Sequence, residues 1–296
     1  VFLYLLSALL KFCFRPLMST LADCPGFFLD ETPPVIPNIL EGGNILDQNR
    51  YKVICQTFEN KRRFLTLYDT TNKIPVFSAY RFTGAAETGR PKDRDIWKIE
   101  PQALNSDYVN NQGYNRGHLY PNCHAQDWND KLSTFTLTNV VPQSIPFNSG
   151  SWAQMERCTK CFMENNCINA NGRIEAFVVA GAEPGETKLN NKVSIPSRMW
   201  SAFCCYNSRD GVWLSKAYWG HNQPNMCDLD ERSLQGMQME MLVENHLHHF
   251  LHQRPPSLLL QVKHLFQQCL GQLYWLHHKH PILSQQPMRR PCLPHL

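Results

Sequence analysis

Tyr114-Asn115-Arg116-Gly117-His118-Leu119 is the stretch that decides the fold of this chain of 296 residues. Asn148 lies 30 residues after His118, and Glu156 lies eight residues further on. Histidine titrates near neutral pH and suits a general base, and an amide oxygen can bind a hard divalent cation that keeps several waters. A carboxylate can hold one of those waters, and Arg116 can pair with a phosphate through two N–H groups. The ordered set therefore predicts a site for hydrolysing phosphodiesters.

Each of these residues has a more ordinary interpretation when it is taken alone. A lone histidine is more often structural than catalytic, and an asparagine such as Asn148 near the start of a helix is usually its cap. Arginine followed by glycine is common. The prediction depends on the order and spacing of the whole set.

The composition is ordinary for a soluble globular protein and permits a polyanionic partner without requiring one. Hydrophobic residues make up 43% of the chain and charged residues 18%, and the formal net charge is +4. An enzyme that acts on nucleic acid needs only a local basic groove. Two candidates are the segment Lys61-Arg62-Arg63 and the set Arg90, Lys92, Arg94 and Lys98. Each could equally be a solvated charged face.

The N-terminus and the 12 cysteines both favour export. Val1 to Leu10 is an apolar run too short to span a bilayer, and Thr20-Leu21-Ala22 ends like a signal-peptidase site. We expect residues 1–22 to be a secretory signal, the protein to be extracellular, and no stable membrane association. Disulfides are then the default, with Cys24 and Cys55 as one candidate pair. The alternative is that Cys158-x-x-Cys161 forms half of a zinc site.

The apolar pattern predicts an α+β architecture with a mostly antiparallel sheet. A strand through Phe64 to Tyr68, a polar turn over Asp69 to Lys73 and a strand from Ile74 to Phe82 predict a hairpin. A helix is expected from Ser151, where Ser and Gln have the spacing of a capping box, with Trp152 and Glu156 on one face. Further strands are expected at Thr134 to Val141, Ile174 to Ala180, Arg198 to Tyr206 and Val212 to Tyr218.

Changes in composition suggest where the domain begins and ends. Asp23 to about Arg50 is rich in Pro and Gly and predicts an irregular lead-in. Nine of the 12 histidines lie between His246 and His295. We therefore expect one domain over residues 23–230 and a variable or poorly ordered His-, Leu- and Gln-rich tail over residues 231–296. A metal-binding role for this tail is the alternative.

Asn115-Arg116-Gly117-His118 resembles the Asp-Arg-Gly-His signature of the DNA/RNA non-specific endonucleases, which are ββα-metal (His-Me finger) nucleases. The segments Thr134 to Gln143, Phe147-Asn148 and Trp152 to Glu156 are similar to the rest of that signature, spacings included. Other segments resemble a secreted vertebrate branch of the family: Arg63 to Thr70, Lys73 to Tyr80 and Ile195 to Trp200. The resemblance runs from about Cys24 to about Asn222.

The resemblance implies a secreted endonuclease with little sequence specificity, which uses Mg²⁺, or Mn²⁺, to cut DNA, RNA or both. It implies His118 as general base and Asn148 as the direct metal ligand. Glu156 would be the outer-shell partner of the metal-bound waters, and Arg116 would contact the phosphate. Arg94 would be the second arginine of the family, although Arg90 competes for that position. Arg90 and Lys98 would bind substrate. Asn139 would support the site.

One position departs from the signature, because Asn115 stands where the family has aspartate. The change leaves the metal ligand in place but removes a carboxylate near a histidine and an arginine. The alternative function is therefore a catalytically weakened, secreted member of the same fold that binds nucleic acid or protein. The sequence does not decide between DNA and RNA.

Overall fold

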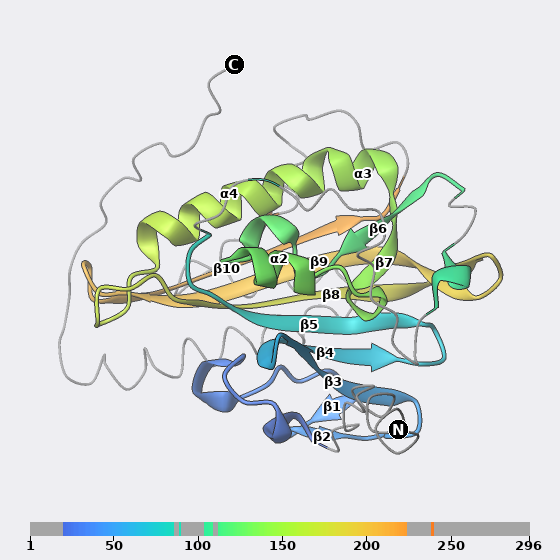
Figure 1. Cartoon of the computed structure of the whole chain (residues 1–296), viewed down its shortest axis with the longest axis horizontal. Helices are drawn as coiled ribbons and strands as arrows, with labels where there is room; N and C mark the ends of the chain where they lie inside the picture. The colour runs from blue at the N-terminus through green and yellow to red at the C-terminus, as the bar shows by residue number, and fades with distance from the viewer. Residues whose placement is uncertain (1–19, 86–88, 90–103, 109–111, 224–237, 240–296) are drawn as a thin grey trace, which may run out of the picture.

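The computed structural model describes residues 20–85, 89, 104–108, 112–223 and 238–239 (Figure 1). Residues 1–19 of the expected signal over residues 1–22 lie outside the described residues, as does the tail apart from Gln238–Met239. So do four basic residues of the candidate groove: Arg90, Lys92, Arg94 and Lys98.

A seven-stranded antiparallel sheet with the strand order β11-β10-β9-β8-β5-β4-β3 forms the centre of the described structure (Figure 1). Every pairing of neighbouring strands in it is antiparallel, which confirms the predicted α+β class. The strands are β3 (Tyr51–Phe58), β4 (Lys61–Asp69), β5 (Ile74–Phe82), β8 (Ala176–Leu189), β9 (Val193–Asn207), β10 (Val212–His221) and β11 (Gln238–Met239).

The predicted hairpin is the β4–β5 pair, with Asp69 opposite Ile74. The Asp69 carboxylate accepts hydrogen bonds from the backbone N–H groups of Thr71 and Asn72 at 2.9 and 3.1 Å, which closes the turn. Lys73 completes the turn with a φ of 56°.

The strand expected to end at Gly181 is longer than predicted, since β8 continues to Leu189. Gly181 lies inside it because the neighbouring strands leave no space for a side chain. A Cβ atom there would lie 2.6 Å from the carbonyl oxygen of Val76 and would also meet the ring of Trp200. The glycine therefore marks close packing within the sheet instead of a strand end.

Two layers cover the two faces of the sheet (Figure 1). One face packs against β6 (Tyr114–His118), β7 (Val140–Ser144), α2 (Trp128–Ser133), α3 (Ile145–Ser149) and α4 (Ser151–Asn166). The lead-in segment packs against the other face and is more regular than expected, with the short elements η1 (Leu21–Asp23), η2 (Leu29–Glu31), β1 (Leu40–Glu41) and β2 (Asn44–Ile45). It buries apolar side chains such as Phe27, Ile36 and Leu40.

The prediction of a strand over Thr134 to Val141 is wrong in its first part. The chain forms the 3-10 helix η5 (Leu137–Asn139), and the strand β7 begins at Val140. The buried amide of Asn139 donates to the carbonyl oxygen of Thr134 at 3.1 Å, which holds this segment as a turn. The expected capping box at Ser151 is also wrong, because Gly150 is the N-cap of α4 and makes no side-chain cap.

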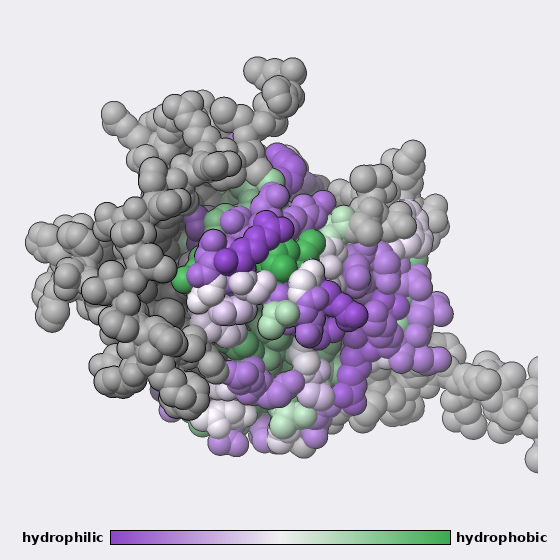
Figure 2. All heavy atoms as spheres, turned by 90° about the vertical axis from the view of Figure 1, so that its left-hand side faces the viewer, coloured by the Kyte–Doolittle hydropathy of each residue, from purple (hydrophilic) through white to green (hydrophobic). Residues whose placement is uncertain are grey.

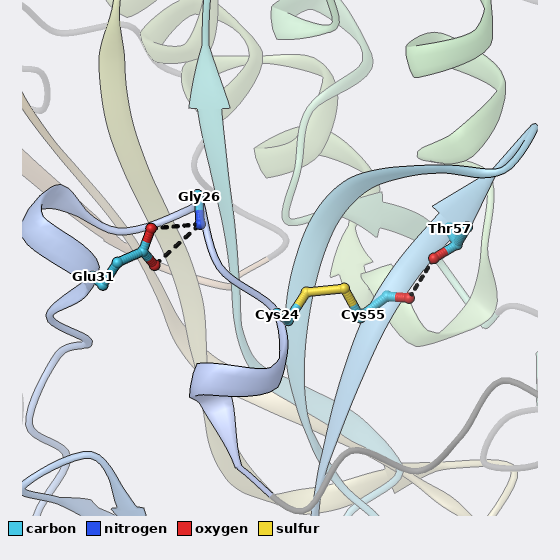
Figure 3. The surroundings of a disulfide bond; sticks show 5 residues. All are labelled: Cys24, Gly26, Glu31, Cys55 and Thr57. Carbon is cyan, nitrogen blue, oxygen red and sulfur yellow. Dashed lines mark hydrogen bonds between the residues drawn. A yellow bond between two sulfur atoms is a disulfide. The ribbon is translucent and has the colours of Figure 1, made fainter.

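Disulfide bonds connect the covering layers to the sheet. Cys24–Cys55 joins the lead-in segment to β3 and confirms the predicted pair (Figure 3). Cys167, at the end of α4, is bonded to Cys205 of β9. Cys161 is also in a disulfide. The half zinc site proposed for Cys158-x-x-Cys161 is therefore wrong.

Seen from the end at which α4 terminates, the described surface is mainly hydrophilic, with only small apolar areas (Figure 2). Large exposed hydrophobic side chains among the described residues come from separate elements: Leu46, Leu104, Trp128, Ile145 and Val212. Scattered apolar residues of this kind are normal on a globular surface. Among the described residues, no helix combines the length and the apolar character needed to cross a membrane.

Candidate active site

The decisive stretch of sequence forms β6, which pairs with β7 in a two-stranded antiparallel ladder. His118 is opposite Val140 and Asn115 is opposite Gln143. Side chains alternate between the two faces of a strand, so Arg116 and His118 share one face of β6. Asn115 projects from the other face. The Asn115 side chain, which departs from the family signature, therefore does not lie between the side chains of Arg116 and His118.

His118 is half-buried at the end of β6, where its ring meets the edge of the buried Phe135 ring at a centroid distance of 4.9 Å and an angle of 85°. The next residue, Leu119, donates its N–H to the carbonyl oxygen of Asn139 at 2.9 Å. The imidazole is therefore packed against an aromatic side chain, and the backbone that follows it is held by a hydrogen bond to Asn139.

Asn139 is the residue that fixes this backbone. Its side chain is fully buried, and its Oδ1 accepts from the Tyr120 N–H at 3.0 Å and from the Ser78 hydroxyl at 2.9 Å. Its Nδ2 donates to the carbonyl oxygens of Tyr120 and Thr134 at 3.2 and 3.1 Å. A buried amide that makes four hydrogen bonds is a rigid junction. It ties the segment after His118 to strand β5.

Asn148 lies on α3, immediately after β7. Its neighbour Phe147 is fully buried and packs against Trp152 of α4 at a centroid distance of 5.3 Å. This contact anchors α3 and leaves Asn148 half-exposed. Among the described residues, the Asn148 side chain has no hydrogen-bond partner, so its amide oxygen is available to a ligand.

Glu156 lies one turn after Trp152 on α4, as the sequence predicts. Burial raises the pKa of its carboxyl to about 8, while the Trp152 side chain and the Arg157 charge act in the opposite direction. The residue as a whole is only partly exposed. In the absence of a cation, Glu156 is thus mostly protonated at neutral pH.

His124 brings the Glu156 turn of α4 next to the segment that follows His118. Its Nε2 donates to the carbonyl oxygen of Glu156 at 2.8 Å, and its Nδ1 accepts from the Tyr80 hydroxyl at 2.8 Å. Burial lowers the pKa of His124 to about 4, so the ring is neutral and both contacts are satisfied. No local pattern predicts this role, because Tyr80 and Glu156 are 44 and 32 residues away along the chain.

Two further buried amides contact the ladder and were not predicted. Asn222 accepts from the Ser144 N–H at 2.7 Å and donates to the carbonyl oxygens of Pro142 and Pro196 at 2.9 and 3.0 Å, which fastens β7 to β9. Gln143 is fully buried, and within the described residues its side-chain O and N have no hydrogen-bond partner. It occupies the space above Gly117, where a Cβ atom would lie 2.6 Å from the Cβ of Gln143.

One group of basic residues in the candidate groove has a structural role. Arg63 is buried and donates to the carboxylate of Asp130 at 2.7 Å, while Lys61 and Arg62 are exposed. Arg63 is therefore unavailable to a substrate, and only part of this segment can line a groove. Arg90, Arg94 and Lys98 lie outside the described residues, so their roles remain predictions.

The donor set suits a hard cation with few protein ligands. The described part of the chain contains no cluster of three or more His, Cys, Asp and Glu residues that could hold a metal. Asn148 offers one neutral oxygen, and Glu156 offers a desolvated carboxyl whose ionised form a nearby cation would favour. Mg²⁺ retains several waters and is often bound through one or two protein oxygens.

Comparison with known proteins identifies the family of this chain. A model of the family described as DNA/RNA non-specific endonuclease matches residues 43–255, which is most of the chain. Endonuclease domain-containing 1 protein from Homo sapiens is 28% identical over 211 residues, and the match covers 62% of this chain and 39% of that protein. The Mus musculus protein of that name is 28% identical over 215 residues, covering 64% and 40%. The chain thus spans about two fifths of these relatives.

Shorter matches include the protein named Nuclease EXOG, mitochondrial, from Mus musculus, which is 40% identical over 98 residues, covering 30% of this chain and 26% of that protein. Among solved structures, the EndoG/EndoGI complex matches with a TM-score of 0.49 and 19% identity, covering 62% of this chain and 80% of the other.

Proposed function

Because this chain belongs to the DNA/RNA non-specific endonuclease family, we propose that it hydrolyses phosphodiester bonds of DNA, RNA or both with little sequence preference. The observation that supports this most strongly is the β6–β7–α3–α4 unit. It carries a histidine on β6, an amide on α3 and a desolvated carboxyl on α4.

Each side chain has a distinct proposed role. His118 takes the proton of the attacking water, and the Phe135 edge limits the orientations of its ring. Arg116, on the same face of β6, binds the phosphate and stabilises charge on its oxygens in the transition state. Asn139 keeps the backbone after His118 in place.

We propose that Asn148 holds Mg²⁺, or Mn²⁺, directly and that Glu156 holds the waters around it. A bound divalent cation would stabilise charge on the phosphoryl and leaving oxygens. Glu156 serves this site in its ionised form, so the raised pKa of the metal-free protein makes cation binding and proton release coupled events.

Asn115 bears on how active the protein is. Because it lies on the face of β6 opposite Arg116 and His118, we propose that the protein retains activity despite the missing carboxylate. The second candidate function, binding without efficient cleavage, is favoured if Asn115→Asp raises the rate strongly. Plasmid cleavage by the two proteins distinguishes these functions.

We propose secretion as the location. The bonds Cys24–Cys55 and Cys167–Cys205 are typical of proteins that mature in an oxidising compartment. Secretion of a tagged protein from cultured cells, and its mobility with and without reductant, test the location.

Plasmid cleavage with Mg²⁺ tests the function. Wild type should cut, and EDTA should abolish cutting. His118→Ala should lower the rate about 10²- to 10⁴-fold, the usual contribution of a general base. The matched control is His221→Ala, which removes an exposed histidine on β10 and should cut like wild type. Equal rates for His118→Ala and wild type would rule out His118 as the base.

A further inference from the structure

Tyr108 is a buried side chain at the candidate site for which neither the sequence nor the proposed reaction assigns a role. It is 7% exposed and belongs to the apolar core beneath the β6–β7 ladder. Its ring lies under the guanidinium of Arg116, with 5.5 Å between the ring centroid and Cζ. Its hydroxyl donates to the carbonyl oxygen of Val140 at 3.1 Å.

The hydroxyl contact ties Tyr108 to the catalytic end of the ladder. Val140 is the residue of β7 that stands opposite His118. Burial raises the pKa of the Tyr108 phenol far above its ordinary value, so the hydroxyl remains a donor at any pH of interest. One tyrosine thus contacts the proposed phosphate-binding arginine and the backbone across from the proposed base.

The segment that carries Tyr108 is itself held firmly. Asp107 is buried, and its carboxylate accepts from Lys73 Nζ and from the Leu104 N–H, each at 3.0 Å. Its carbonyl oxygen accepts from the Asn190 amide at 3.2 Å. These contacts connect the short helix η3 (Asn105–Asp107) to the turns after β4 and β8. The Tyr108 ring is therefore a fixed surface under Arg116.

The chemistry of this contact suits a phosphate-binding arginine. A cation over the face of an aromatic ring is attracted by the ring quadrupole. Bidentate pairing with phosphate uses N–H groups at the edge of a guanidinium, so it is compatible with an aromatic ring packed beneath the same group. Desolvation by the protein lowers the pKa of Arg116, and the ring compensates part of the lost hydration.

We propose that Tyr108 is a positioning residue for Arg116, which holds the guanidinium on the His118 face of β6 so that it meets the phosphate of the substrate. This inference rests on the proposed nuclease function. Tyr108 does not touch the substrate in this role. It acts by restricting where Arg116 can go.

The test compares Tyr108→Leu and Tyr108→Phe with wild type. Removing the ring with Tyr108→Leu should lower kcat/KM roughly 2- to 30-fold, the range expected for loss of a cation–π contact. It should also raise the Kd for a short DNA duplex, measured in EDTA so that nothing is cut. Tyr108→Phe keeps the ring, so its kcat/KM should stay within about 2-fold of wild type.

The chain offers a matched control for general damage to the fold. Tyr51 is also 7% exposed and also lies under an arginine, with Arg50 Cζ at 5.0 Å from its ring centroid. That pair is on β3 and the loop before it, away from the ladder. Tyr51→Leu should lower thermal stability as Tyr108→Leu does, yet leave kcat/KM and the Kd for DNA as in wild type.

A double-mutant cycle with Arg116→Ala separates positioning from packing. If Tyr108 acts through Arg116, then Tyr108→Leu should change kcat/KM by less than about 2-fold once Arg116 is gone. An equal loss in both backgrounds would overturn the proposal, as would a loss no larger than that of Tyr51→Leu. If wild type cuts nothing, the proposed function fails. The role of Tyr108 is then decided by measuring the Kd for uncut DNA for the same set of variants. Kd values that do not change among these variants would also overturn the positioning role of Tyr108.

Discussion

His124 should make this protein less stable as the pH is lowered, by an amount that its surroundings determine. Burial lowers the pKa of its imidazole to about 4 in the folded protein, against 6.5 for an ordinary histidine. The folded state therefore favours the neutral ring, and its contribution to stability is complete above pH 6.5. As the pH falls towards 4, the unfolded chain takes up a proton that the folded protein does not. The difference of about 2.5 pH units corresponds to about 3 kcal/mol.

Glu156 would mask this effect unless it is removed. Its pKa is raised to about 8, so the folded state binds a proton that the unfolded chain releases above pH 4.5. Its contribution is complete below pH 4.5 and is lost as the pH rises through 8, which is the opposite trend. The comparison is therefore made in the Glu156→Gln background. The backbone carbonyl that accepts from His124 Nε2 is unchanged there.

The assay is urea unfolding of Glu156→Gln with and without His124→Asn, from about pH 7.5 to about pH 4.5. Between about pH 6 and pH 4.5 the protein with His124 should lose about 1.2 kcal/mol per pH unit more than the protein without it. Two curves that stay parallel over this range would refute the reasoning, because His124 would then titrate as in the unfolded chain.

Three further predictions concern the cation, the ladder and the lead-in segment. With a pKa of about 8, Glu156 is mostly protonated at pH 7, so Mg²⁺ binding should release about 0.9 proton in calorimetry across buffers of different ionisation enthalpy, and none in Glu156→Gln. Asn222→Ala removes three buried hydrogen bonds and should cost about 2–4 kcal/mol in urea unfolding. Replacing Cys24 and Cys55 by serine opens a loop with a sequence separation of 31 and should cost about 3–4 kcal/mol, measured as a lower Tm.

Each of these has a control. If Glu156→Gln and wild type release equal numbers of protons on Mg²⁺ binding, the proton comes from a group other than Glu156. For Asn222, the neighbouring Gln223→Ala removes an exposed amide, and equal stability of the two variants would contradict the clamp. For the disulfide, reduction of wild type should lower the Tm further than serine replacement does, because it also opens Cys167–Cys205. A Tm that serine replacement leaves unchanged would show that the lead-in segment is held by its apolar contacts alone.

The parts of the fold that sequence predicts well are those decided by neighbours along the chain. The strand Ile74 to Phe82 and the turn before it have the predicted bounds, because alternating apolar residues and an aspartate that closes the turn are local signals. Thr134 to Val141 has a similar apolar pattern but forms a 3-10 turn first. The cause is the side chain of Asn139, which bonds to Tyr120 and to β5, and this contact has no local signature.

The candidate site divides in the same way. His118, Asn148 and Glu156 are candidates because of their order and spacing, and their roles stay predictions. The structure places them on β6, α3 and α4 of the β6–β7–α3–α4 unit. The residues that fix this unit come from elsewhere: His124 contacts Glu156 across 32 residues, and Asn222 contacts Pro142 across 80. Which distant side chain meets which carbonyl depends on packing, and packing cannot be deduced from spacing.

Asn222 has a consequence for the order in which the site is assembled during synthesis. It fastens β7 by hydrogen bonds to Ser144 and Pro142, which precede it by 78 and 80 residues. When a ribosome has just finished β7, β5 already exists but β9 and Asn222 do not, so the β6–β7 ladder lacks its attachment to β9. The elements that carry the proposed site are thus made before the residue that fastens β7 to β9. A nascent chain therefore contains His118, Asn148 and Glu156 before the clamp on β7 is complete.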